Sequence, residues 1–234
     1  MKHNLALLLI IIVFASCSTG SKVVKYPTRP DDVFANANLK LFFKATPSPA
    51  IVLKVPNSTD KATSNSVNNA DNALLYNAIE KELLKEGFSV RDRGLFNELI
   101  QKTNSDDYSK IRDLTNTDLI LEVVNIDLNV KYTTNQITET SKGKEHEVVQ
   151  AIEYKGTGVS IQFKLILVKT NEIAGTYNFN YKPCPDGCEL VNFKTVARRS
   201  TEVELKESIS SKSDELEEFM NRCTKDLVKS FKNS

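Results

Sequence analysis

Hydrophobic and polar residues alternate along this chain with two different periods, and each period marks one kind of element. Between residues 69 and 86 apolar side chains recur every three or four positions, which predicts a helix that ends at Gly87. Between about 119 and 181 they recur at every second position, which predicts strands. From Ser213 onward the helical period returns. The apolar stripe of this last predicted helix is Leu216, Met220, Cys223, Leu227 and Phe231.

Shorter patterns predict the elements between these blocks. Residues 49–56, an apolar run between two prolines, predict a buried strand, and residues 88–90 predict a short one. Asp92 is placed to cap a second helix, and Ser105 to cap a third. Residues 31–45 fit a short amphipathic helix and an extended segment equally well, so both interpretations remain open.

The strand region begins with an alternating run at about 119–132. After a polar stretch at 133–147 comes a return run with Val148, Ile152 and Tyr154, and then alternating runs at 159–167 and 173–181 that a tight turn at Asn171 separates. Residues 190–196 are a further strand candidate. We expect the stripe Tyr177, Phe179 and Tyr181 to lie in the sheet core, and Gly156-Thr157-Gly158 to mark a bulge rather than a phosphate-binding loop. The pattern predicts an α+β fold, a mixed β-sheet with helices packed on it and a C-terminal helix.

Composition and charge narrow the class of protein. The chain has 234 residues, 40% hydrophobic content and a formal net charge of +1. This hydrophobic content is sufficient for a packed core. A near-neutral chain offers no electrostatic case for nucleic acid as a partner. No serine or cysteine stands in a recognisable nucleophile motif, so we expect a protein that is not an enzyme.

The first residues read as an export signal. Lys2 precedes an apolar run from Leu5 to Phe14, and Ala15 and Ser16 stand directly before Cys17. The run is too short to cross a hydrocarbon core as a helix, which takes about 20 residues. The segment resembles the lipobox of bacterial lipoproteins. That resemblance implies cleavage before Cys17 and acylation of its thiol and amine. Ser18 in place of aspartate implies transfer to the outer membrane, with the protein facing the periplasm.

These signals predict a three-part organisation. Residues 1–16 form a lipoprotein signal peptide, residues 17–45 form the lipidated N-terminus and a tether, and residues 46–234 form a single envelope domain. The tether prediction rests on residues 18–30, which carry Ser, Thr, Gly, Lys and Pro with few apolar groups.

The remaining cysteines suggest a disulfide. Cys184 and Cys188 flank Pro185-Asp186-Gly187, whose turn chemistry can bring the two sulfurs together in an oxidising compartment. Cys223 on the helical stripe is most simply a small buried residue. A zinc site joining these three cysteines to His146 is the alternative. The spacing of the first two is one residue longer than in the commonest zinc knuckles and no second pair follows, so we expect no metal and no cofactor.

Three segments carry a resemblance to a known group of proteins. They are the helix end at residues 79–93 with Gly87 and Arg91-Asp92-Arg93, the strand start at 117–121, and the strand pair at 161–173. Together they resemble envelope proteins that include the curli-secretion lipoprotein, the N-terminal domain of the Tol-system β-propeller protein and the lipoprotein activators of penicillin-binding proteins. The resemblance covers about residues 46–232 and implies a mixed sheet with helices packed on it.

The resemblance also sets two functions against each other. The curli channel forms its pore from two added hairpins per subunit, and the matching segments here are 127–154 and 177–196. Polar residues such as Gln136, Gln150 and Lys194 interrupt their apolar faces, which favours hairpins with one dry face. We therefore expect a lipid-anchored binding or assembly module of the outer membrane with a protein partner in the envelope. The alternative is a subunit of an oligomeric outer-membrane secretion channel. With either function the protein can form a homo-oligomer.

Overall fold

The computed structural model describes residues 21–56, 69–103, 108–141, 143–190, 202–208 and 213–233. The helices are α2 (Ala37–Ala45), α3 (Asn69–Lys85), α4 (Arg93–Thr103), α5 (Tyr108–Thr115) and α6 (Ser213–Asn233). The strands are β1 (Ser21–Val24), β2 (Asp32–Ala35), β3 (Ala50–Lys54), β4 (Ser89–Val90), β5 (Leu119–Ser141), β6 (Lys144–Leu167), β7 (Glu172–Tyr181), β8 (Cys188–Glu189) and β9 (Glu202–Ser208). No helix in this described part is long and apolar enough to cross a membrane.

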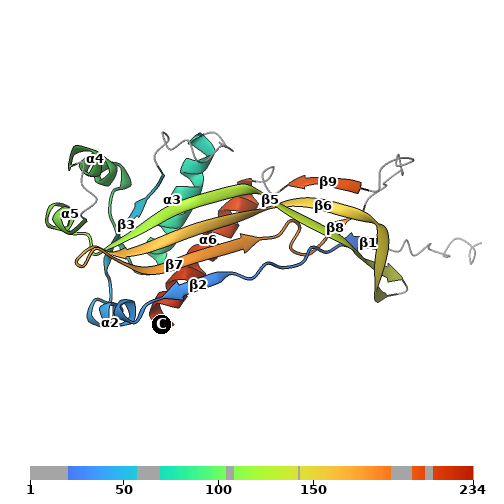
Figure 1. Cartoon of the computed structure of the whole chain (residues 1–234), viewed down its shortest axis with the longest axis horizontal. Helices are drawn as coiled ribbons and strands as arrows, with labels where there is room; N and C mark the ends of the chain where they lie inside the picture. Colours follow the sequence, from blue (N-terminus) through green and yellow to red (C-terminus); the bar gives the residue numbers. More distant parts are fainter. Residues whose placement is uncertain are drawn as a thin grey trace, which may run out of the picture.

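All the described strands belong to one mixed, nine-stranded sheet built on the long β5–β6 hairpin (Figure 1). Near the ends of the hairpin arms, β5 pairs in parallel with β3, and β6 pairs antiparallel with β7, whose other edge carries β2. Near the hairpin turn, β5 pairs instead with β1, and the middle of β6 pairs in parallel with β9. The sheet therefore has two halves that share β5 and β6. We call them the helix-covered half and the distal half.

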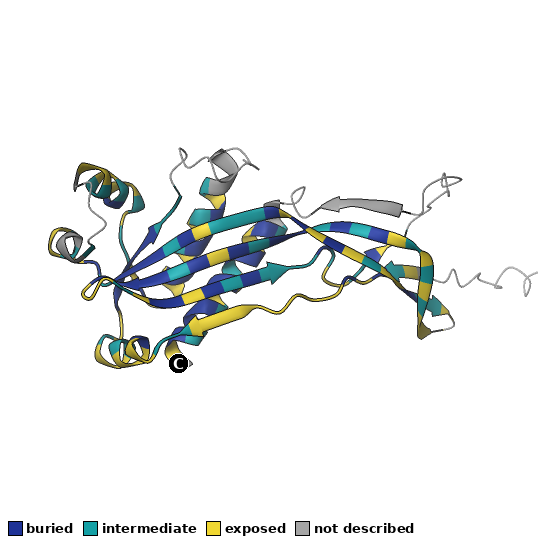
Figure 2. Cartoon of the chain, viewed as in Figure 1, coloured by how far each residue is buried: buried dark blue, intermediate teal, exposed yellow. Residues whose placement is uncertain are grey.

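Helices α2, α3 and α6 cover one face of the helix-covered half (Figure 1). Helix α6 contributes the predicted apolar stripe, and all five residues of that stripe are buried. The odd-numbered positions of β6 from Val159 to Leu167 meet these helices and are buried as well (Figure 2). Burial of this many side chains is the main stabilising contribution to the fold. The alternating stripe Tyr177, Phe179 and Tyr181 packs in the same core, as predicted.

Helices α4 and α5 pack on the opposite face of the sheet. Phe96 of α4 is 2% exposed and lies with Val52, Ile120, Ile166 and Val168 in a separate small core. The Asp92 carboxylate accepts a hydrogen bond from the Leu95 backbone N–H at 2.7 Å, so it caps α4 as predicted. These two helices cover only the end of that face.

The distal half has its own core, built around aromatic side chains. Tyr26 and Tyr132 are each 2% exposed, and they meet edge to face with ring centroids 6.3 Å apart. The Arg29 guanidinium lies 4.6 Å from the centroid of the Tyr132 ring. A Cβ atom on Gly156 would lie 2.7 Å from the Tyr26 ring, so this glycine provides the room that the ring occupies. The predicted bulge at Gly156-Thr157-Gly158 also coincides with an irregularity, since the pairing of β6 with β9 shifts between Lys155 and Thr157.

Strand β6 changes its buried face where the two halves meet. From Val148 to Gly158 the even-numbered residues are the less exposed ones, and from Val159 onward the odd-numbered ones are buried. Neighbouring residues of a strand point to opposite faces. The two cores therefore lie on opposite faces of one continuous strand. Across from this point β5 has an irregularity between Asp127 and Val130, which adds one residue to β5.

Most of the predicted elements are confirmed. The buried strand is β3, the first helix is α3 followed by Gly87 at φ +93°, and the short strand is β4. The mixed α+β architecture with a C-terminal helix is also confirmed. Residues 104–107, with the predicted cap Ser105, lie outside the described residues, as do residues 191–196 of the last strand candidate.

Two segments differ from expectation, and a third contains both of the interpretations that its pattern allows. Residues 21–24, expected within a tether, form β1 and pair with β5. Residues 31–45 contain both alternatives, because β2 is extended and α2 is helical. The polar stretch 133–147, expected between strands, continues them as far as Ser141 and from Lys144, because β1 supplies a partner for β5 there.

Candidate functional site: the uncovered face of the sheet

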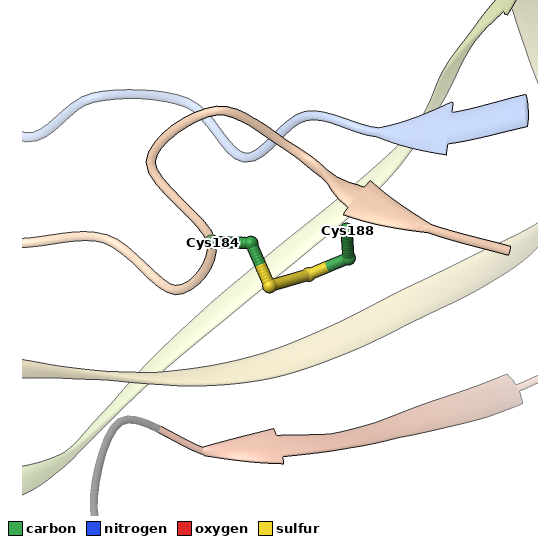
Figure 3. The surroundings of a disulfide bond; sticks show 2 residues. All are labelled: Cys184 and Cys188. Atoms are coloured by element: carbon green, nitrogen blue, oxygen red, sulfur yellow. A yellow bond between two sulfur atoms is a disulfide. The ribbon is translucent and has the colours of Figure 1, made fainter. Parts of the chain in front are cut away.

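The disulfide expected between Cys184 and Cys188 is present, with the two Cα atoms 5.3 Å apart (Figure 3). It closes the loop that leads from β7 to β8. Within the loop the Gly187 N–H donates to the Cys184 carbonyl at 2.8 Å, and after it the Leu190 N–H donates to the Lys22 carbonyl at 2.8 Å. The bond therefore fixes the chain that follows β7 against β1, beside the distal core.

The zinc alternative loses its ligands in this arrangement. Two of its cysteines are bonded to each other, and Cys223 is 1% exposed in the other core. Burial raises the pKa of the Cys223 thiol well above its ordinary value. His146 lies on the exposed side of the hairpin opposite Glu139. Within the described ranges, no three metal-ligating side chains come together.

Cys17 lies outside the described residues, so its acylation stays a prediction. The second predicted hairpin, 177–196, differs from expectation in the part that is described. Strand β7 does not fold back on itself, since β8 pairs with β1 instead. The first, 127–154, is paired as sheet on both sides of an irregularity, at which residues 150–153 have no partner in β5.

The most distinctive surface is the part of the sheet that α4 and α5 leave uncovered. We call it the uncovered face. It carries the even-numbered residues from β6 and β7, which pair as Gln162 with Asn178 and Lys164 with Thr176. A shallow pocket of about 320 Å³ lies here. Its lining residues are Asp32, Val124, Gln162, Phe163, Lys164, Thr176, Tyr177 and Asn178.

A charge cluster separates this pocket from α5. Glu122 accepts from Lys54 Nζ at 2.6 Å and lies 3.5 Å from Lys164 Nζ. Lys54 also donates to the Tyr108 hydroxyl at 2.7 Å. Burial lowers the pKa of Lys54, but its hydrogen bonds to Glu122 and Tyr108 outweigh that effect and leave the pKa raised. The cluster therefore keeps its charges fixed in place.

Apolar side chains border the same surface. Phe34 pairs with Thr176 and is 59% exposed, and Ile173 pairs with Ile166 and is 53% exposed. Val124, at an irregularity of β5, is 42% exposed. Exposed large apolar groups around polar ones are typical of protein interfaces. The Asn178 Oδ1 atom is buried without a hydrogen-bond partner in the described part, so it can accept from a bound group.

Sequence reasoning missed this surface for a specific reason. Ile173 falls in step with Tyr177 and Phe179, and that alternation predicted a single face. An irregularity between Leu165 and Ile166 displaces the register, so that Ile173 points to the opposite face from Tyr177. Phe34 lies in segment 31–45, whose pattern fits a helix and an extended segment equally well. No signal in the sequence marks the position of Ile173, because the irregularity is defined by the partner strand.

Comparison with known proteins adds little. No protein-family model and no curated protein matches the sequence. Two solved structures of the PelC dodecamer from Paraburkholderia phytofirmans are similar in outline. One has a TM-score of 0.30 at 8% identity, covering 87% of this chain and 98% of that chain. The other has a TM-score of 0.29 at 7% identity, covering 92% and 98%. At such TM-scores no inference about this chain is drawn from the likeness.

Proposed function

We propose that this protein is an outer-membrane lipoprotein, acylated at Cys17 and facing the periplasm, that binds a protein partner of the envelope. It acts as a binding or assembly module rather than as an enzyme. The observation that carries the binding part is the uncovered face, where Phe34 and Ile173 are more than half exposed beside a polar pocket. Because each side chain is already nearly half covered, burying the rest against a partner would contribute about 1–1.5 kcal/mol each.

The side chains of the pocket suit a protein ligand. Amide, hydroxyl and ammonium groups can hydrogen-bond to a polar rim, while the apolar pair supplies the desolvated contact. The Glu122 cluster adds a fixed charge pattern that favours one orientation of the partner.

The channel alternative receives less support from the hairpin. On β6, the side that carries Val148, Ile152 and Tyr154 is interrupted by Gln150. It therefore lacks the unbroken apolar band that a membrane-spanning hairpin presents to lipid. Self-association is a second candidate, because β2 is an edge strand of the sheet and exposes Val33 and Phe34. Molar mass measured by light scattering over a concentration series distinguishes a monomer from an oligomer.

Site-specific photo-crosslinking in living cells tests the proposed interface. A photoreactive residue at Phe34 should give one discrete adduct with an envelope protein. The adduct should be lost when Thr176→Arg is introduced beside it, because the large cation obstructs the surface. A photoreactive residue at Val149, which is 68% exposed on the distal half, serves as the matched control. Equal adducts at both positions, or an adduct that persists with Thr176→Arg, would refute this interface.

Lipidation has its own test. Cys17→Ala should release the protein from membranes or leave its signal uncleaved, because the acyl chains supply about 0.8 kcal/mol for each buried CH₂ group. Mass spectrometry of the N-terminal peptide should show acyl chains in the native protein, and density fractionation should place it with outer membranes. An unmodified N-terminal peptide would contradict the proposal.

A further inference from the structure

The chain that would join the lipid to the sheet is very short. Four peptide units separate Cys17 from Ser21, where β1 begins, and Ser21 pairs with Thr140 next to the hairpin turn. We propose that the end of the sheet around this turn, which comprises the described residues 21–25, 139–141 and 143–147 and which we call the tip, lies against the phospholipid headgroups of the membrane. The inference rests on the proposed acylation of Cys17 and names the surface that the distal half contacts.

Chain geometry limits the distance between the lipid and the tip. A residue spans at most about 3.6 Å, so Ser21 lies within about 14 Å of Cys17 in any conformation of the residues between them. Paired Cα atoms of antiparallel strands are about 5 Å apart. Thr140 therefore lies within about 20 Å of the acylated residue. The opposite end of β6 is about 75 Å away along the strand.

The tip carries the chemistry that a headgroup layer accepts. The Nζ atom of Lys22 lies 2.7 Å from the Glu139 carboxylate, and that of Lys25 lies 3.6 Å from the Glu145 carboxylate. The hydrogen bond to Glu139 raises the pKa of Lys22, so that this ammonium stays charged. Paired charges of both signs resemble the zwitterionic headgroups around them, and they are unsuited to the hydrocarbon interior.

The charge balance of the tip says which force holds it there. Residues 21–25 and 139–147 together contain four lysines and three glutamates. So small an excess provides little attraction to anionic lipid, for which clusters of basic residues are needed. The short link to the acyl chains supplies the contact instead, because it keeps the tip at a high effective concentration next to the surface. Contact should therefore be nearly independent of the anionic lipid content.

This placement orients the rest of the molecule. The elongated sheet extends from the tip toward α2 and α4, at the other end of the molecule (Figure 1). The helix-covered half, with Phe34 and Ile173, then projects into the aqueous compartment, where a protein partner can reach it.

Fluorescence quenching on vesicles tests the contact. The full-length acylated protein is reconstituted in phosphatidylcholine vesicles that contain a headgroup-linked quencher. A fluorophore is attached through Ser141→Cys at the tip, or through Lys169→Cys in the exposed turn after β6 as the matched control. Cys223 is buried and the other two described cysteines are bonded, so they do not compete for the label. We expect quenching several-fold stronger at position 141 than at 169, unchanged when 30% anionic lipid is added.

The outcomes separate this inference from the proposed lipidation. Equal quenching at both positions in protein that floats with the vesicles would overturn the tip contact alone. Protein that does not float, with an unmodified N-terminal peptide, would overturn both proposals. A 20-residue Gly/Ser linker inserted after Ser18 has a root-mean-square length of about 25 Å and should reduce quenching at 141 to the control level. The same linker added after Ser234 should change nothing, and persistent quenching with the N-terminal insertion would overturn the role of the short link.

Discussion

The two halves of the sheet share β5 and β6 but stabilise them by different means. The helix-covered half buries its apolar positions under three helices, with Phe163, Phe219 and Phe231 among its largest buried side chains. The core of the distal half contains fewer residues, among them Tyr26, Tyr132 and Cys188. In the distal half, a disulfide and aromatic rings packed against glycines stabilise the sheet, whereas a helical layer stabilises the other half. A single strand can therefore belong to two cores of very different size.

The largest effect on stability is expected from a substitution of Phe231 in the helix-covered half. Its ring stacks on Phe43 at 5.6 Å and meets Tyr177 edge to face at 5.4 Å, and it is fully buried. Phe231→Ala should lower the free energy of unfolding by about 3–5 kcal/mol, because it leaves a cavity under the sheet. Urea unfolding measures the loss. A change below about 1 kcal/mol would mean that the helical layer is not the main source of stability.

A glycine in the distal half gives the next largest effect. Gly156→Ala brings a Cβ within 2.7 Å of the Tyr26 ring and 2.8 Å of Pro183, so we expect a loss of about 1–3 kcal/mol. Hydrogen exchange should increase in β1 and the paired part of β5 but not in β3. Gly94→Ala on α4, where the nearest atom would be the Asp92 carboxylate at 3.3 Å, is the control and should cost less than about 1 kcal/mol. Uniform acceleration in both halves would break the comparison.

Removal of the disulfide should have a smaller effect. Cys184→Ser with Cys188→Ser should cost about 1–2 kcal/mol, because so short a loop restricts few unfolded conformations. Again the faster exchange should be confined to β1 and β8. Thiol labelling of the native protein lacking residues 1–17 should modify none of its three cysteines, since Cys223 is buried and its thiol pKa is raised. Ready labelling of Cys184 and Cys188 would contradict the pairing.

The smallest expected difference between the two halves is in the pH at which their buried tyrosines ionise. Burial raises the pKa of Tyr26 in the distal core, and of Tyr177 in the other, to about 12 in each case. An unfolded tyrosine ionises near 10, so folding favours the protonated phenol, and the stability present below about pH 10 is lost as the pH rises toward 12. If the distal half opens first, Tyr26 should ionise at the lower pH. Phenolate absorbance of Tyr26→Phe and Tyr177→Phe variants assigns the two steps, and coincident ionisation would mean that both halves open together.

The sequence predicted those elements that local interactions specify. The α6 stripe and β3 are specified by periodicity within one segment, and both are confirmed. The paired strand β1 could not be predicted, because its Ser and Lys residues are ordered by hydrogen bonds to β5, more than a hundred residues away. The change of buried face in β6 was visible as even-numbered Val148, Ile152 and Tyr154 before odd-numbered Val159 and its successors. The change is explained only by the structure, in which the distal core lies on the opposite face of the strand.

The uncovered face was less predictable than the fold. Its pocket residues come from β2, β5, β6 and β7, and none of them has a neighbour in the sequence that marks it. Two irregularities of pairing determine where Val124 and Ile173 point. Sequence periodicity cannot locate such irregularities, since the extra residue is defined by the partner strand.

The register of β1 also determines how the molecule would respond to a mechanical load. Residues 21–24 run antiparallel to 140–137, with Ser21 at the end nearer the hairpin turn. A pull on the chain ahead of Ser21, directed away from the body of the protein, acts along β1. Its hydrogen bonds to β5 are then loaded together in shear, rather than broken one after another as in unzipping. An attachment made at this end would resist force better than the four-residue length of the strand suggests.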